Sequence, residues 1–288
     1  MSIHSEASFS NNPRFRLLGA MALGLLAAAC GDTAGIGTPD TVALEFRVSS
    51  GQPALASSVD GPTRTTGPLA AISGPPLVFE GTNGTLTIDE VRVIVAEFEL
   101  EGDDDACERA SGDSLMDDDC ADFEAPPRFF DLPLDGEPVS AFSGTVDAGT
   151  YKELEFEIED LEDDETDGDF AAEIAQLRTE ILAEFPDWPR KASALVVGTF
   201  EADQGPIAFR VYLDAEIEIE MDLIPNLVVD VDGDAGTRLT VDIRPDLWFT
   251  RVDGSVLPLH LYDWDATGEL LEFELEMENG FTEVEIGS

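Results

Sequence analysis

The chain has 288 residues, and its 62 acidic against 15 basic side chains leave a formal net charge of −47 at pH 7. A protein this acidic repels nucleic acid and anionic lipid surfaces, which excludes both as attractive partners. Apolar residues make up 43% of the chain and follow regular patterns, so we expect a folded protein rather than a disordered acidic segment. The charge suits solubility, a salty environment that screens it, or cation binding.

Residues 1–29 have the pattern of a signal peptide that ends at a lipid-attachment cysteine. Arg14 and Arg16 precede the apolar run Leu17–Ala29, and small residues lead up to Cys30. The run is shorter than the roughly 20 residues that span a bilayer, so a retained transmembrane helix is the weaker alternative. The end of the run resembles the lipobox of bacterial lipoproteins, which implies a lipid on Cys30. Ordinary secretion with cleavage nearby is the other alternative.

The residues after the cysteine predict a tether and an isolated strand. Gly31 in place of Asp resembles lipoproteins that are sent to the outer membrane, so we expect an outer-membrane lipoprotein on its periplasmic or cell-surface face. Residues 30–40 are small and polar and predict the tether. Residues 41–49 alternate between apolar and polar and predict a strand. Residues 50–76 are rich in Gly, Pro, Ser and Thr and predict a linker, so this strand would dock loosely or belong to the tether.

Residues 77–288 are predicted to form one acidic β domain. The period-two segments that predict its first strands are Leu77–Glu80, Thr85–Ile88, Val91–Leu100, Arg128–Leu132, Val139–Val146 and Glu153–Leu161. The later ones are Ala194–Phe200, Ile207–Met221, Leu227–Val231 and Arg238–Ile243. Ile207–Met221 exceeds a usual strand length, so we expect a bulge or bend near Asp214.

Two further segments interrupt the strands. Residues 101–124 are acidic and predict a surface insertion, in which Cys107 and Cys120 would form a disulfide in an exported protein, contributing about 3 kcal/mol. Two free thiols are the alternative. Residues 169–185 predict an amphipathic helix that covers a sheet edge or end, with Asp167 or Asp169 as its cap. Its apolar stripe consists of Phe170, Ile174, Leu177, Ile181 and Phe185.

The C-terminus predicts a hairpin. Glu272–Glu278 and Phe281–Ile286 flank Asn279-Gly280, a strong two-residue turn signal. Counting outward from the turn places the apolar residues of both strands on one face. A helix over Glu269–Glu278 is the alternative, because Glu, Leu and Met favour helices.

About a dozen strands, one helix and no βαβ alternation predict an all-β fold, an antiparallel β-sandwich or half-open barrel. Three motifs stand out along the predicted strands: Phe130-Asp131-Leu132-Pro133-Leu134, Ala148-Gly149-Thr150-Tyr151 and Leu239-Thr240-Val241-Asp242-Ile243. These motifs, in this order of elements, resemble a group of uncharacterised bacterial lipoproteins with a prealbumin-like sandwich domain. The resemblance covers Leu86 to Leu257 and implies this fold and an anchored, exported state. It brings no catalytic residues.

Catalytic chemistry finds little support in the residue types. His4 would leave with the signal peptide, so His260 stands alone and is interpreted as structural. A lone histidine cannot build a catalytic triad or a histidine metal cluster, and we expect no enzyme.

Calcium is the one cofactor that the sequence suggests, through acidic loops rich in oxygen ligands. The alternative for each loop is a solvated acidic turn. The candidate ligands, besides the acids of residues 103–119, are Asp163, Glu165, Asp167, Asp169, Asp230, Asp232 and Asp234. Rows of acids along Glu153–Glu159, Asp214–Glu220 and Glu272–Glu278 would also oppose like charges if two rows were neighbours.

These observations predict a lipid-anchored envelope protein with a structural or binding role, joined to the membrane through Cys30. The alternative is a calcium-dependent module that binds carbohydrate or an envelope protein. Trp188, Trp248 and Trp264 distinguish the two: an exposed group favours a glycan or protein ligand, and burial favours a structural role.

Overall fold

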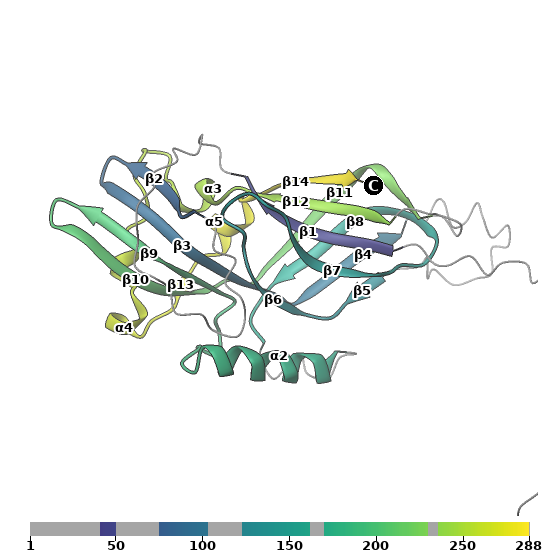
Figure 1. The fold of residues 1–288 in the computed structure, drawn as a ribbon, viewed down its shortest axis with the longest axis horizontal. Coiled ribbons are helices and arrows are strands. Elements are labelled where there is room, and N and C mark those ends of the chain that lie inside the picture. The colour runs from purple at the N-terminus through teal and green to yellow at the C-terminus, as the bar shows by residue number, and fades with distance from the viewer. Residues whose placement is uncertain (1–40, 50–74, 103–122, 162–169, 230–235, 288) are drawn as a thin grey trace, which may run out of the picture. The chain divides into compact units, whose positions relative to one another are not determined.

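The computed structural model forms three β-sheets, here named A, B and C, with the helix α2 beside them (Figure 1). The predicted all-β sandwich is confirmed. All the described residues belong to one compact unit, Gly37–Ser288. They are residues 41–49, 75–102, 123–161, 170–229 and 236–287. Cys30, Cys107 and Cys120 lie outside them, as do residues 1–40 and most of the predicted linker.

Sheet A contains the N-terminal strand as a central member. Its order is β14 (Phe281–Gly287), β12 (Thr237–Ile243), β1 (Thr41–Val48) and β7 (Val139–Thr145). β1 pairs in parallel with β12 and antiparallel with β7. Val42, Leu44, Phe46 and Val48 are all buried, so β1 is part of the core and not a loosely docked segment.

Sheet C faces sheet A across the apolar core. Its order is β11 (Ile217–Val229), β8 (Gly149–Ile158), β4 (Glu97–Gly102) and β5 (Phe123–Ala125). Phe46 of β1 meets Phe156 of β8 with ring centroids 5.3 Å apart. Phe98 of β4 meets Phe142 of β7 at 5.6 Å. These contacts between the two inner faces make A and C the two layers of the sandwich.

Two strands of sheet B continue along the chain into strands of sheet C. Its order is β13 (Leu271–Glu272), β10 (Gly205–Asp214), β9 (Ala194–Ala202), β3 (Gly84–Val95) and β2 (Leu77–Gly81), and β6 (Arg128–Asp131) also pairs with β3. The chain passes from β3 into β4 at Ala96 and from β10 into β11 after Asp214, which confirms the predicted bend.

The fully buried Ser193 holds both passages in place. Its carbonyl oxygen accepts a hydrogen bond from the N–H of Ile94 at 2.8 Å. Its Oγ accepts another from the N–H of Ala215 at 3.0 Å. One small polar residue thus satisfies backbone donors beside both bends, where the regular sheet ladder is interrupted.

The predicted amphipathic helix is α2 (Ala171–Glu184), and its apolar stripe packs on sheet B as expected. Ile181 is buried against Ile94, and Ile174, Leu177 and Phe185 pack around them. The N-cap residue is Phe170, which has no capping side chain. The proposed caps Asp167 and Asp169 lie outside the described residues.

The predicted C-terminal hairpin is wrong. Residues Glu274–Glu278 form the helix α5, and β14 pairs with β12 instead. The helix places Phe273 and Met277, four residues apart, on one side, and both are buried. The indole Nε1 of Trp248, from α3 (Pro245–Phe249), donates to the carbonyl oxygen of Met277 at 2.7 Å.

Short helices add to the one helix that the sequence predicts. Besides α2, α3 and α5, the described part of the chain contains α4 (Trp264–Thr267) and a 3₁₀ turn, η2 (Leu259–Tyr262). No helix among the described residues is long and apolar enough to cross a membrane.

Candidate functional site

The outward face of sheet C consists of acidic side chains in cross-strand register. Successive strand residues point to opposite faces, so the apolar partners of these acids line the core while the acids face outward. We call this surface the carboxylate face. It comprises Glu97, Glu99, Glu101, Glu124, Glu153, Glu155, Glu157, Glu218, Glu220 and Asp222.

The register places like charges directly opposite one another. Glu220 of β11 is opposite Glu155 of β8, which is opposite Glu99 of β4. Glu99 is in turn opposite Glu124 of β5. Each opposed pair of like charges costs roughly 0.2 to 1 kcal/mol. Two of the three acidic rows, those of β8 and β11, are neighbours, so the condition for opposed like charges is met; the third row, Glu272–Glu278, does not form a strand because α5 is a helix.

Glu155 lies at the centre of the carboxylate face. Burial raises its pKa to about 7, together with a shared hydrogen bond to Glu218 and repulsion from that residue, Glu99 and Glu220. One carboxylate oxygen from each of Glu155, Glu218 and Glu220 lies within 4.8 Å of the others. Glu97, Glu99 and Glu124 form a second group of this kind. Such spacing allows three carboxylates to contact one cation.

On the outward face of sheet A, by contrast, arginine side chains contact the acids, although the whole chain is equally acidic. There Arg47 of β1 binds Asp242 of the neighbouring β12 through two hydrogen bonds of 2.7 Å. It also contacts Glu285 of β14 at 2.9 Å. Sheet A thus has one acid opposite another, Asp242 opposite Glu283, but Arg47 binds Asp242, whereas sheet C sets acids opposite acids on all four of its strands. Lys152, which contacts Glu101 at 2.7 Å, brings one positive charge to sheet C.

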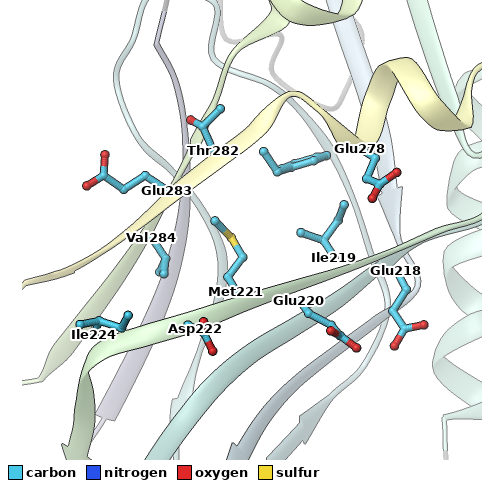
Figure 2. A pocket seen from close by; sticks show the side chains of 11 residues that line it. Glu218, Ile219, Glu220, Met221, Asp222, Ile224, Glu278, Thr282, Glu283 and Val284 are labelled. Carbon is cyan, nitrogen blue, oxygen red and sulfur yellow. The ribbon is translucent and has the colours of Figure 1, made fainter.

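A groove of about 500 Å³ opens between β11, at one edge of sheet C, and β14, at one edge of sheet A. Figure 2 shows Ile219 and Met221 on the side of β11 that faces the groove, with Val284 of β14 opposite them. The carboxylates of Glu218 and Glu220 lie on the other side of the β11 ribbon. The groove thus has an apolar floor and adjoins the carboxylate face.

The sequence located part of this site. All the candidate calcium ligands in the loops, Asp163 to Asp169 and Asp230 to Asp234, lie outside the described residues, as do residues 103–119. The sequence pattern did not identify Glu97, Glu99 and Glu124 as members of the carboxylate face. The alternation of Glu97, Glu99 and Glu101 was a usable signal, but their neighbours in space depend on the pairing of β4 with β8 and β5.

The tryptophans belong to the packing of the domain. Trp248 is fully buried, and Trp188 and Trp264 are half-buried, both with their rings edge-on to Tyr212. They do not form an exposed aromatic group, so the tryptophans favour a structural role and give no support to an aromatic surface for a glycan. His260 stacks on Phe200 with ring centroids 4.4 Å apart.

No protein-family model matches the chain, and no curated protein matches it. Among solved structures, MbnP from Methylosinus trichosporium is similar, with a TM-score of 0.36 and 14% identity. The alignment covers 75% of this chain and 80% of that chain. Neither the fold nor the function of MbnP is transferred to this protein at that level of similarity.

Proposed function

We propose that this protein is an exported, lipid-anchored envelope protein whose β domain binds a cationic ligand and does not catalyse a reaction. The observation that carries the binding role is the carboxylate face. Opposed acids lower the stability of a sheet, and in sheet A of the same domain Arg47 partly offsets this cost by binding Asp242 and Glu285. A bound cation or a basic partner would offset the repulsion on sheet C.

The anchored state is supported by the sequence of residues 14–31 and by the resemblance to prealbumin-like lipoproteins. Its test is metabolic labelling of cells that express the full chain with an alkyne-tagged fatty acid. We expect label in the wild type and in Cys107→Ser, and no label in Cys30→Ser. Label that persists in Cys30→Ser would contradict the anchor.

The non-enzymatic role is supported by the setting of His260. Its imidazole stacks on Phe200, and its Nδ1 is buried without a hydrogen-bond partner among the described residues. A general base is normally held by a partner that orients its ring. This arrangement favours packing as the role of the side chain.

A more specific candidate for the cationic ligand is calcium. The three oxygens of Glu155, Glu218 and Glu220 lie within 4.8 Å of one another, and hard carboxylate oxygens are the ligands that calcium prefers. Binding to the ionised carboxylates would lower the raised pKa of Glu155, because metal ligands must be deprotonated.

Thermal unfolding tests the calcium candidate. We expect millimolar calcium chloride to raise the Tm above that in sodium chloride of equal ionic strength, because a ligand of the folded state stabilises it. The double variant Glu218→Gln/Glu220→Gln should lose this difference. The matched control Glu201→Gln/Asp203→Asn, at exposed positions near the β9–β10 turn, should keep it. Equal Tm values in both salts would exclude a calcium site on this face.

A further inference from the structure

The groove between β11 and β14 has the features of a peptide-binding edge. β14 ends the strand order of sheet A, and β11 ends that of sheet C. The outer edge of a terminal strand presents backbone N–H and C=O groups that can pair with an additional strand. Partners that add a strand in this way gain affinity from main-chain hydrogen bonds and specificity from alternate side chains.

The floor of the groove is apolar: Met221 and Val284 are partly exposed there, and Ile219 is buried beneath them. Ile219, Met221 and Val284 lie between the two strands, as Figure 2 shows, and Ile224 lies beside them with 85% of its surface exposed. An extended peptide would place every second side chain on this floor, because strand side chains alternate with period two.

The charge around the floor has one sign. The carboxylates of Glu278 and Glu283 stand on the β14 side, and those of Glu218, Glu220 and Asp222 stand on the β11 side. None of the described residues that line the groove is Lys or Arg. A second copy of this chain, with the same net charge of −47, would be repelled, whereas a basic ligand would be attracted.

We propose that this groove binds an extended basic segment of a partner protein, with its apolar side chains on the floor and its Lys or Arg side chains against the carboxylates. The segment alternates between apolar and basic residues and adds to the β14 edge of sheet A. The inference rests on the binding role proposed above and names the chemistry of the partner. A protein that binds calcium but not the peptide would contradict the peptide groove and leave the cation-binding role intact.

Fluorescence anisotropy with labelled synthetic peptides tests the proposal on the full-length protein at low salt. The probe is an eight-residue peptide of alternating Lys and Val. The comparison peptides are its block version with the same composition, octalysine, and alternating Glu and Val. We expect the alternating basic peptide to bind at least about tenfold more tightly than the block peptide or octalysine, and the acidic peptide not to bind. Equal affinity for the alternating and block peptides would overturn the proposal.

Two variants locate the binding. Glu278→Lys/Glu283→Lys, at exposed positions, should weaken binding of the alternating peptide by at least about tenfold. Glu201→Lys/Asp203→Lys changes the net charge equally but lies near the β9–β10 turn, and it should weaken binding less than about twofold. Ile224→Ser should also weaken binding of the alternating peptide. Because Ile224 is exposed, this substitution should not disturb folding. An equal loss of peptide affinity in both charge variants would show a general electrostatic effect and would contradict the groove as the binding site.

Amide hydrogen exchange locates the bound peptide in the wild-type protein, without any change of surface charge. We expect the bound peptide to slow exchange in β14, residues 281–287, and to leave the β9–β10 turn unchanged. Size-exclusion chromatography with light scattering tests the other occupant. A stable dimer that dissociates in Glu278→Lys/Glu283→Lys would assign the groove to a second copy and overturn the peptide proposal.

Discussion

Glu155 combines burial with repulsion from its neighbours. Its pKa of about 7 in the folded protein lies above its ordinary value of 4.5. The pKa of Glu153 is raised as well, by burial and by the nearby Glu101. Between pH 4.5 and about 7, the folded state therefore binds more protons at Glu155 than the unfolded chain does. Because of this difference, the stability of the folded state falls as the pH rises through that window.

We therefore expect the Tm to rise as the pH is lowered from about 7.5 to about 5.5. Glu155→Gln should raise the Tm at the higher pH, because it removes a charge that the fold disfavours, and should flatten the dependence on pH. Scanning calorimetry across this window measures both effects. Glu216→Gln, at an exposed position between β10 and β11, is the control and should leave the slope unchanged. An undiminished slope in Glu155→Gln would assign the pH dependence to other groups.

The segment from α5 to β14 shows how a distant aromatic ring selects between two local structures. Asn279-Gly280 follows α5 directly, and the indole of Trp248 lies against Gly280. A Cβ at Gly280 would overlap that ring. Glycine is therefore required here by the close approach of Trp248, and the turn signal that predicted a hairpin has a packing cause.

Gly280→Ala should destabilise the protein by about 1 to 3 kcal/mol, since the added methyl group must displace a buried indole from its hydrogen bond to Met277. Urea unfolding followed by tryptophan fluorescence measures the change. Gly149→Ala is the matched control, because a Cβ there would meet Tyr151 at an ordinary 3.7 Å. The structure assigned to α5 would be contradicted if both variants had equal stability.

The whole domain carries its charge unevenly. Sheet A balances acids with Arg47 and Arg238, which contacts Glu45 at 3.2 Å, while sheet C opposes acids with acids. Salt screens repulsion between exposed charges, and the screening length falls from about 10 Å at 0.1 M to about 3 Å at 1 M. Repulsion on the carboxylate face should therefore depend strongly on ionic strength.

We expect the Tm to rise as sodium chloride is increased from about 0.05 M to about 1 M. The increase should be smaller in Glu155→Gln/Glu220→Gln, which removes two opposed charges from neighbouring strands. Arg47→Gln should enlarge it, because Asp242 and Glu285 would then lack their common basic partner. Differential scanning fluorimetry in a salt series measures all three proteins. A Tm that does not change with salt would exclude repulsion as a factor in stability.

Local sequence pattern was sufficient for the elements that bury one face. The alternation in β1, β8 and β10–β11 identified these strands, because a period of two assigns each side chain to the core or to solvent. Ile174, Leu177 and Ile181 identified α2, because apolar residues three or four positions apart lie on one face of a helix. The acidic rows of the site were visible in the same alternation.

The partners of these elements could not be read from the pattern, because strand pairing depends on residues far apart in the chain. β1 could serve as a loose segment or as a central strand until its pairing with β12 and β7 was known. The sequence of Glu274–Glu278 is consistent with a strand or a helix. The helix is selected by burial of Phe273, which stacks on Phe249, and of Met277, which accepts a hydrogen bond from Trp248. The alternating acids show that each strand has an acidic face, and the register of β11, β8, β4 and β5 brings those acids together. The carboxylate face is therefore a product of long-range pairing, which sets the distances between charges that local sequence leaves open.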